Sequence, residues 1–331
     1  MAEHKALLLG LGFWGEFWLA AIQRSDRLRL AGVSRRHPFT KDELSKYGIS
    51  EDTVFADYSE AITRTDASIA VIALPTEMHA EAVSVAIENG MHVICDKPVV
   101  SNMSEADMIR ELCEKHPDQK LMVSQNYRWR PHNQTLKKAI KEGMIGQIGS
   151  VLVEFRRPED LIGYREFLEM PLLEDVSIHH FDLIRFFTER KCEEIYATCH
   201  RPYWSKFPGK SSTEAIMSME GGIVVNYNAT WAARGKESSW DGNFAISGEK
   251  GCLTLDVNDA VHFFESGKAE GILIENVKME LTEIDYAVDN FVSSIEEGGR
   301  SDSDFQENYH SFSMLCAAKE SVRLNKPVLL N

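Results

Sequence analysis

Three glycines near the start of the chain constrain its fold more than any other feature. Gly10, Gly12 and Gly15 are spaced as G-x-G-x-x-G, directly after the apolar run KALLL and before EFWLAAI, which has helical spacing. The first glycine permits a tight turn, the second lets backbone approach a pyrophosphate, and the third lets the helix pack close to the strand. The phosphate then lies at the helix N-terminus, where free N–H groups favour an anion. This strand–turn–helix context predicts a dinucleotide-binding site.

Short apolar runs and helical patterns alternate over the first 125 residues. Strands are predicted at 6–9, 28–33, 69–74, 92–95 and 121–124, and helices at 16–24, 57–63, 77–89 and 104–115. The strands are apolar throughout rather than alternating, which is typical of strands buried on both faces. The pattern predicts an α/β domain over residues 1–125 with a Rossmann doubly wound parallel sheet.

The chain after residue 125 has a different organisation. Strands are predicted at 147–156, 194–201, 213–220, 222–230, 243–247, 252–256 and 260–265, and helices at 176–188, 286–297 and 305–324. Successive strands joined by glycine-containing turns indicate a large, mostly antiparallel sheet. We therefore expect a second, α+β domain over residues 126–331 for substrate binding and oligomerisation, with a cleft between the domains.

Charge and cysteine usage narrow the classes of partner and compartment. The chain has 36 Lys and Arg against 51 Asp and Glu, and this net charge of −15 argues against nucleic acid and membrane surfaces as partners. No apolar run approaches the ~18 residues of a membrane span, and the first residues do not resemble a signal peptide. The six cysteines are scattered without a C-x-x-C pair, so we expect reduced thiols, no cysteine-based metal site and a cytoplasmic location.

The residues after the second predicted strand bear on the choice of cofactor. An NAD-binding chain is expected to carry Asp or Glu about 20 residues beyond the glycines, to bind the ribose hydroxyl. This chain has Ser34, Arg35 and Arg36 there. Without the carboxylate a 2′-phosphate is not repelled, and either arginine can pair with it. The residues favour NADP over NAD, and the alternative is that the arginines are solvated loop charges.

A lysine follows the predicted strand at 92–95. Ligands bind at the carboxyl ends of strands in doubly wound sheets, so Lys97 is placed where it can exchange a proton during carbonyl–alcohol interconversion. Pro98 fixes its own φ, and a cis bond before it would direct Lys97 into the cleft. The alternative for this motif taken alone is a surface lysine paired with Asp96.

The helix predicted at 176–188 begins among polar residues. Asp175, His179 and Asp182 lie at i, i+4 and i+7, so we expect them on one helix face. Such a face is costly to bury unless it is paired or functional. A structural histidine held by Asp182 is the alternative. His180 lies on a neighbouring stripe and ranks below His179, and the zinc spacing H-E-x-x-H is missing, so we expect no metal.

Five segments in this order resemble one enzyme family. They are the glycine motif, residues 73–79 (similar to T-P-N-x-x-H), Asp96-Lys97-Pro98 (similar to E-K-P), Asn126-Tyr127-Arg128, and Asp175, His179 and Asp182 (similar to D-x-x-x-H-x-x-D). Over nearly its whole length the chain resembles the Gfo/Idh/MocA oxidoreductases, which include glucose–fructose oxidoreductase and inositol dehydrogenase. Three positions depart from the family pattern, namely Asp96 for Glu, Thr76 for Asn and Ser177 for Gly.

The resemblance implies an NAD- or NADP-dependent dehydrogenase, without a metal, that acts on a secondary carbinol of a sugar or cyclic polyol. It also implies a homodimer or homotetramer built on an open sheet face of the second domain. Lys97, His179 and Asp175 would be catalytic. With the residues argued above, cofactor contacts are expected at Gly10, Gly12, Phe13, Trp14, Gly15, Ser34, Arg35, Arg36, Leu74, Pro75, Thr76, His79, Asp96 and Lys97. Substrate contacts are expected at Lys97, Asn126, Tyr127, Arg128, Arg156, Asp175 and His179, with Trp129, Trp231 and Trp240 as further candidates.

In the proposed mechanism His179, oriented by Asp175 or Asp182, takes the hydroxyl proton during oxidation. Lys97 stabilises the developing alkoxide, and the sequence leaves open which of the two is the primary base. Two alternatives stay open. The same scaffold can use a recycled nicotinamide for elimination or glycoside cleavage, or the chain can be a cofactor-binding regulator without turnover.

Overall fold

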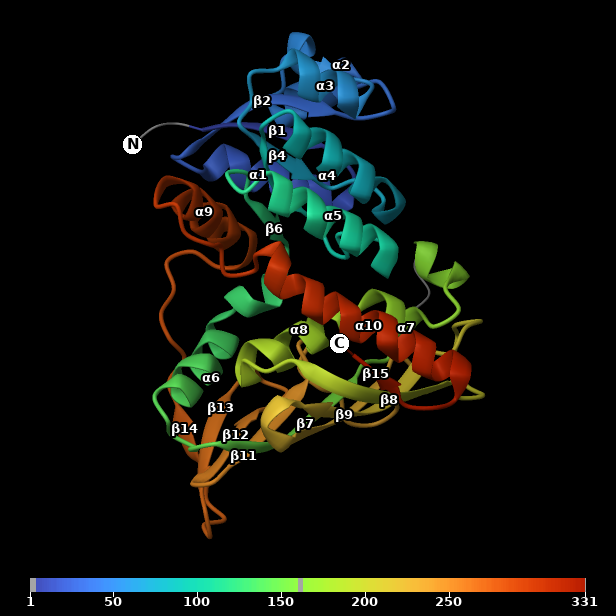
Figure 1. Cartoon of the computed structure of the whole chain (residues 1–331), viewed down its shortest axis with the longest axis vertical. Coiled ribbons are helices and arrows are strands. Elements are labelled where there is room, and N and C mark those ends of the chain that lie inside the picture. The colour runs from blue at the N-terminus through green and yellow to red at the C-terminus, as the bar shows by residue number, and fades with distance from the viewer. Residues whose placement is uncertain (1–3, 160–162, 331) are drawn as a thin grey trace. The chain divides into compact units, whose positions relative to one another are not determined.

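The computed structural model describes residues 4–159 and 163–330, with the backbone alone at Tyr164. The chain divides into two compact units, each described by itself. The first comprises the chain up to Asn126 together with Leu281–Tyr309, and the second comprises Tyr127–Glu280 and the chain from His310. Figure 1 labels the helices and strands.

The first unit is built on a six-stranded parallel sheet. Its strand order is β3-β2-β1-β4-β5-β6, which is the classical doubly wound order. The strands are β1 (His4–Leu9), β2 (Leu28–Ser34), β3 (Val54–Phe55), β4 (Ile69–Ile72), β5 (His92–Cys95) and β6 (Leu121–Val123). The helices are α1 (Phe13–Arg24), α2 (Lys41–Tyr47), α3 (Tyr58–Arg64), α4 (His79–Glu88), α5 (Met103–Lys115) and α9 (Glu283–Glu296). The predicted Rossmann fold is confirmed, because the central strands are buried and parallel.

Helix α9 belongs to the first unit, although the sequence placed everything after residue 125 in the second domain. It packs on α1 through an apolar face that includes Val288 and Phe291. Arg27 adds ion pairs to Asp289 and Glu296, both at 2.7 Å. The expected boundary is therefore corrected: the chain returns to the first unit over residues 281–309 because this helix covers part of its core.

The second unit is built on a nine-stranded sheet. Its order is β14-β13-β12-β11-β7-β10-β9-β8-β15, and the pairs are antiparallel except for β7 with β10. The strands are β7 (Ile148–Arg156), β8 (Cys192–His200), β9 (Ser212–Met219), β10 (Ile223–Thr230), β11 (Asn243–Gly248), β12 (Gly251–Leu255), β13 (Val261–Glu265), β14 (Ile272–Ile274) and β15 (Val328–Leu329). The helices are α6 (Pro131–Lys141), α7 (Pro171–Asp175), α8 (Ser177–Thr188) and α10 (Phe305–Leu324), the last of which continues from the first unit. The expected mostly antiparallel sheet is confirmed.

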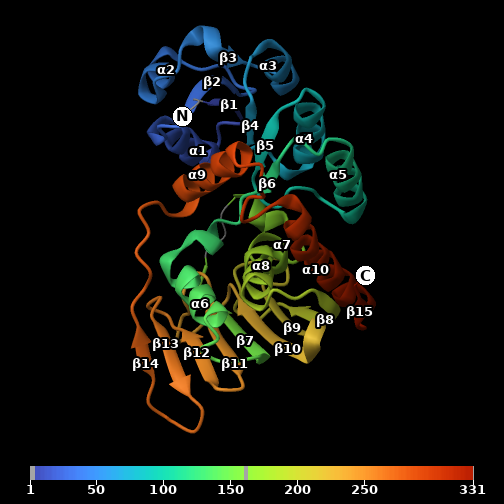
Figure 2. The ribbon, with the colours of Figure 1, turned by 60° about the vertical axis from the view of Figure 1, so that its left-hand side comes forward.

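The two faces of this sheet differ. Helices α6 and α8 and the later part of α10 lie on one face (Figure 2). The side chains of Val153 and Phe155 on β7 are fully buried on this face. On the opposite face Leu152 and Ile216 are each about half exposed (51% and 53%). One face is thus the core of the unit, and the other is open within this chain.

Two chain-wide features complete the fold. Within the described residues, the helices are all too short or too polar to cross a lipid bilayer. All six cysteines are free thiols.

Candidate functional site

The turn between β1 and α1 explains the three glycines. Gly10 has φ +96°, and a Cβ there would lie 2.4 Å from the carbonyl oxygen of Ala73. A Cβ on Gly15 would lie 2.3 Å from the oxygen of Gly10, so the third glycine is needed where the helix crosses the turn. A Cβ on Gly12 would meet no atom within 4 Å, which leaves its backbone open at the helix N-terminus. This open backbone fits the approach of a pyrophosphate.

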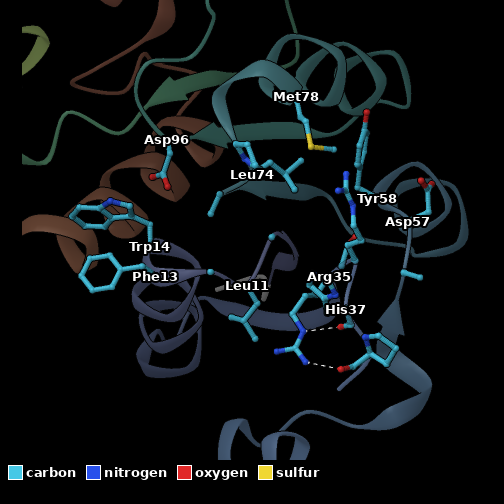
Figure 3. Close-up of a pocket in the computed structure, with 18 of the residues that line it drawn as sticks. Leu11, Phe13, Trp14, Arg35, His37, Asp57, Tyr58, Leu74, Met78 and Asp96 are labelled. Atoms are coloured by element: carbon cyan, nitrogen blue, oxygen red, sulfur yellow. Dashed lines mark hydrogen bonds between the residues drawn. The ribbon is translucent and has the colours of Figure 1, made fainter. Parts of the chain in front are cut away.

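A cavity of about 860 Å³ opens in front of this turn, at the carboxyl ends of the parallel strands (Figure 3). Ten of the predicted cofactor residues line it: Gly10, Gly12, Phe13, Trp14, Ser34, Arg35, Arg36, Leu74, Pro75 and Asp96. Four others are not among the lining residues: Gly15, Thr76, His79 and Lys97. The cavity has the position that a dinucleotide occupies in doubly wound folds, and its size is that of a small-molecule site.

The two arginines after β2 have different environments. The Arg35 guanidinium pairs with both carboxylate oxygens of Glu43, at 2.8 and 3.1 Å, and lies 3.7 Å from the ring centroid of Phe39. Its remaining donors reach the carbonyl oxygens of His37 and Pro38. The hydrogen bond from Arg35 lowers the pKa of Glu43 to about 2, so the pair is charged and internally neutral. Because Glu43 already neutralises Arg35, Arg36 is the better candidate of the two arginines to pair with a phosphate.

Arg36 is the exposed cation of this end of the cavity. Its side chain has no hydrogen bond or ion pair to any residue that the structure describes, and it lines the cavity beside Ser34. Ser34 is buried at the end of β2, so no carboxylate stands at the position that selects NAD.

Asp96 has an indole as its partner. The Nε1 of Trp18, a fully buried residue of α1, donates a hydrogen bond to Oδ1 of Asp96 at 2.8 Å. Burial raises the pKa of Asp96 to about 6, and the Trp18 bond opposes this shift. Lys97 follows directly, and the Lys97–Pro98 peptide is cis. The carboxylate thus faces the cavity while α1 holds it in place.

His79 lies behind the cavity wall. Its Nδ1 is 2.9 Å from the oxygen of Pro98 and its Nε2 is 2.7 Å from the oxygen of Leu74. Burial lowers its pKa, and a neutral ring can donate to only one of the two carbonyls. These two contacts tie the exits of β4 and β5 together, and a cofactor contact of His79 stays a prediction.

In the second unit, the predicted helical face is interrupted. Helix α7 ends at Asp175, and Val176 separates it from α8. The Asp175 carboxylate is 6% exposed and accepts a hydrogen bond from Nε of Arg165 at 2.7 Å. Asp175 is therefore part of an ion pair, and it does not lie on one continuous helix with His179.

The adjacent histidines of α8 have different surroundings. The ring of His179 stacks on Tyr127, with centroids 4.1 Å apart and planes 12° from parallel. The Nδ1 of His180 lies 2.8 Å from the hydroxyl of Tyr227, which is itself 2.8 Å from Oγ of Ser177. His180 is fully buried, and burial lowers its pKa to about 4, so it is a neutral core residue. The ranking of His179 above His180 as a site residue stays a prediction.

Asp182 and Arg128 form a buried ion pair. Arg128 Nε and Nη2 donate to the two oxygens of Asp182, at 2.5 and 2.7 Å, and Ser311 Oγ donates to Oδ1 at 3.0 Å. Arg128 is 6% exposed and Asp182 1%. The Arg128 guanidinium therefore neutralises a core carboxylate, and its expected contact with substrate stays a prediction.

Arg156 lies on the face of the second sheet away from α8, and its expected contact with substrate stays a prediction. Phe155 points toward α8 and contacts His180, so its neighbour on β7 faces the open side of the sheet. There Arg156 lines a shallow pocket with Glu214 and Asn228.

The three candidate tryptophans differ in burial. Trp129 and Trp231 are fully buried and serve packing, whereas Trp240 is 37% exposed.

The remaining predicted substrate residues lie on a short 3-10 helix, Asn126–Trp129, after β6. Asn126 is the last residue of the first unit, and Tyr127 is the first of the second. Within the described part of the chain, no group of three or more His, Cys, Asp and Glu side chains is arranged to hold a metal ion.

Sequence reasoning missed several residues of the cavity. These are Leu11, His37, Pro38, Glu43, Ala56, Asp57, Tyr58, Ala73, Glu77 and Met78. Asp57 and Tyr58 follow β3, a two-residue strand that was not predicted. The signal that could have found Glu43 is the capping box T-K-D-E, in which Thr40 and Glu43 cap α2 reciprocally.

Two family descriptions match successive parts of the chain. Residues 4–125 match the GFO_IDH_MocA oxidoreductase family with an NAD-binding Rossmann fold, and residues 133–254 match the GFO/IDH/MocA C-terminal domain. An inositol 2-dehydrogenase of Rhizobium meliloti is 25% identical over 95% of this chain and 96% of its own. A D-apiose dehydrogenase of Paraburkholderia graminis is 24% identical over 77% of this chain and 68% of its own.

Solved structures share the fold over the whole chain. An oxidoreductase from Agrobacterium radiobacter in complex with NAD⁺, L-tartaric acid and magnesium superposes with a TM-score of 0.89, at 21% identity over 99% of this chain and 98% of that one. A levoglucosan dehydrogenase in complex with NADH gives a TM-score of 0.86, at 20% identity over 99% of both chains.

Proposed function

We propose that this chain, which belongs to the Gfo/Idh/MocA family of oxidoreductases, is an NADP-preferring dehydrogenase of a sugar or cyclic polyol. One observation carries the proposal: a single cavity joins the glycine turn to Asp96, the residue that precedes Lys97. The names of the curated relatives, inositol 2-dehydrogenase and D-apiose dehydrogenase, support the substrate class.

The residues of the first unit fit a nicotinamide dinucleotide. The open backbone at Gly12 and the N-terminus of α1 would hold its pyrophosphate. Ser34 and Arg36 would hold the 2′-phosphate of NADP, with Arg35 and Glu43 as a neutral support beside them. When bound, the nicotinamide supplies the hydride acceptor or donor.

Proton handling is assigned to side chains of both units. Lys97 donates or accepts the proton of the reacting carbinol and stabilises the developing alkoxide. His179 acts as the partner base, with its ring held by the stack on Tyr127. Asp175, in its ion pair with Arg165, supplies negative charge on the same short stretch of chain as His179. General acid–base help of this kind contributes roughly 10²- to 10⁴-fold in rate.

A homo-oligomer is part of the proposal. Leu152, Ile216 and Tyr196 face the open side of the sheet, and the strand pairing places Asn226 between the first two of them in one cross-strand row. Exposed apolar rows of this kind mark interaction surfaces, and a second copy presents the same row. The six free cysteines support a reducing, cytoplasmic location.

A substrate panel tests this function. The purified chain is mixed with cyclic polyols and aldoses in the presence of NADP or NAD, and reduced nicotinamide is followed. We expect at least one substrate to be oxidised, with kcat/KM higher for NADP than for NAD. Failure of every panel member with both cofactors, in the oxidation direction and with the matching ketones in reduction, would contradict the proposed activity.

The cofactor preference has its own test in one arginine variant and a lysine control. In Arg36→Ala, the affinity for NADPH should fall by about 10-fold or more, as expected for loss of a charge-assisted phosphate contact, while NADH binding stays unchanged. In Lys46→Ala, the matched control, an exposed cation of α2 that does not line the cavity is removed, and neither affinity should change. Equal losses for NADPH and NADH in Arg36→Ala would argue against a 2′-phosphate contact.

A further inference from the structure

Three aromatic side chains stand exposed at the start of α1. Phe13, Trp14 and Phe17 are 74%, 44% and 47% exposed. Their ring centroids lie 5.3 to 5.7 Å from one another, so they form one packed aromatic cluster. Single exposed apolar residues are ordinary on protein surfaces, but a contiguous aromatic cluster beside a cavity marks a binding surface.

The cluster borders the reaction end of the cofactor cavity. Phe13 and Trp14 line the cavity, and Phe17 does not. Trp14 and Trp18 are one helical turn apart on α1, and Trp18 holds Asp96. In Figure 3, Phe13 and Trp14 lie toward the same end as Asp96, whereas Arg35, His37 and Tyr58 lie toward the other. The aromatic surface therefore begins at the Asp96 end of the cavity and continues outward over α1.

The chemistry of the cluster selects its occupant. Within the described chain, the indole N–H of Trp14 makes no hydrogen bond, so it can donate to a hydroxyl of a bound molecule. The rings of the cluster offer flat apolar faces and carry no charge, which suits stacking against the face of another ring. Phe13 and Trp14 offer two aromatic faces at the edge of the cavity, which can hold a ring beside the reacting one, and Phe17 continues the cluster outside the cavity.

We infer that Phe13 and Trp14 form a subsite for a second ring that is glycosidically attached to the reacting ring. This inference rests on the proposed dehydrogenase function and deepens it: the preferred substrate is a glycoside rather than a free sugar. The attached ring stacks on the aromatic faces, and it is either an aryl aglycone or a second sugar.

A binding experiment tests the subsite without turnover. The NADP-loaded protein is titrated calorimetrically with para-nitrophenyl β-D-glucoside, cellobiose and methyl β-D-glucoside. We expect the first or the second to bind about 5- to 10-fold more tightly than the methyl glucoside, the gain typical of one aromatic stacking contact. A gain with the nitrophenyl compound alone indicates an aryl aglycone, and a gain with cellobiose indicates a second sugar.

Variants localise the gain. In the double variant Phe13→Ala, Trp14→Ala the preference over methyl glucoside should vanish, whereas in Phe17→Ala, which removes a ring of similar exposure outside the cavity, it should remain. An equal loss in Phe17→Ala, equal affinity of the wild type for all three glucosides, or no binding of any of them overturns the inference. So does a double variant that keeps its glucoside preference and changes only its oligomeric state.

The outcome is separable from that of the proposed function. NADPH binding and the substrate panel report on the dehydrogenase, and neither depends on the attached ring. A wild type that oxidises free polyols and shows no preference for attached rings keeps the proposed function and loses this inference.

Discussion

At the scale of single residues, Asp96 stands where the family pattern has glutamate, and its shorter side chain has a specific partner. An aspartate reaches less far than a glutamate, and here its carboxylate lines the cavity and accepts a hydrogen bond from the indole N–H of Trp18, a buried residue of α1. Burial raises the pKa of this carboxyl to about 6, well above that of an exposed aspartate. The folded protein therefore holds this proton more tightly than the unfolded chain does.

The raised pKa of Asp96 predicts how the free energy of unfolding changes with pH. Between about pH 4 and pH 6 the folded state binds more protons at Asp96, so its contribution to the free energy of unfolding falls as pH rises through this window. Asp96→Asn keeps an oxygen acceptor for Trp18 and removes the ionisation. We expect the variant to match the wild type near pH 4 and to be more stable at pH 7.5 by about 3 kcal/mol, measured by urea unfolding.

Asp26→Asn is the matched control, because it makes the same change at an exposed position of the same unit. Its difference from the wild type should not vary between the two pH values. An Asp96→Asn variant whose stability difference is also independent of pH would show that burial of the charge is not the cause.

Sequence reasoning at this scale identified residue types better than partners. It placed Ser34, Arg35, Arg36 and Asp96 at the cavity, because strand ends fix where such residues emerge. It could not separate Arg35 from Arg36, since that distinction depends on Glu43, which α2 brings back to the end of β2.

At the scale of elements, the open face of the second sheet is the feature that a single chain leaves unexplained. The opposite face is covered by α6, α8 and α10, whereas Leu152, Ile216 and Tyr196 remain exposed on β7, β9 and β8. A row of apolar side chains on central strands suits burial against an identical row across a two-fold axis.

A charge placed in this row should therefore disrupt the assembly. Ile216→Lys is expected to shift the chain toward a monomer in sedimentation velocity, because a lysine at the centre of an interface would be buried without a partner. Leu273→Lys, on the edge strand β14 and 64% exposed, is the control and should leave the assembly unchanged. A wild type that sediments as a monomer would contradict the proposed interface.

Most long elements were predicted, with helix α6 as the exception, and the shortest ones were not. Helix α10 lies at its predicted residues, and the predicted strands of both sheets are present, because their apolar patterns run over several residues. The two-residue strands β3 and β15 are too short to show a period. Helix α9 was predicted as a helix, but its apolar face does not specify that it packs on α1.

At the scale of the whole molecule, the residues proposed to handle the proton are far apart in the sequence. Lys97 follows β5, and His179 lies on α8, where its ring stacks on Tyr127. Helical spacing grouped Asp175, His179 and Asp182, but tertiary partners separate them: Arg165 pairs with Asp175, and Arg128 pairs with Asp182. Such partners come from distant positions in the chain, so a single sequence does not reveal them.

The most direct test of the central claim is the transfer of an isotope label. The best substrate of the panel is deuterated at its carbinol carbon, and the label is followed with NADP in the wild type and in Lys97→Ala. We expect deuterated NADPH and ketone in equal amounts, and a turnover that falls by about 10²- to 10⁴-fold in Lys97→Ala while NADPH affinity is kept. Near-normal turnover in Lys97→Ala, or a product that forms while no reduced nicotinamide accumulates, would contradict the account.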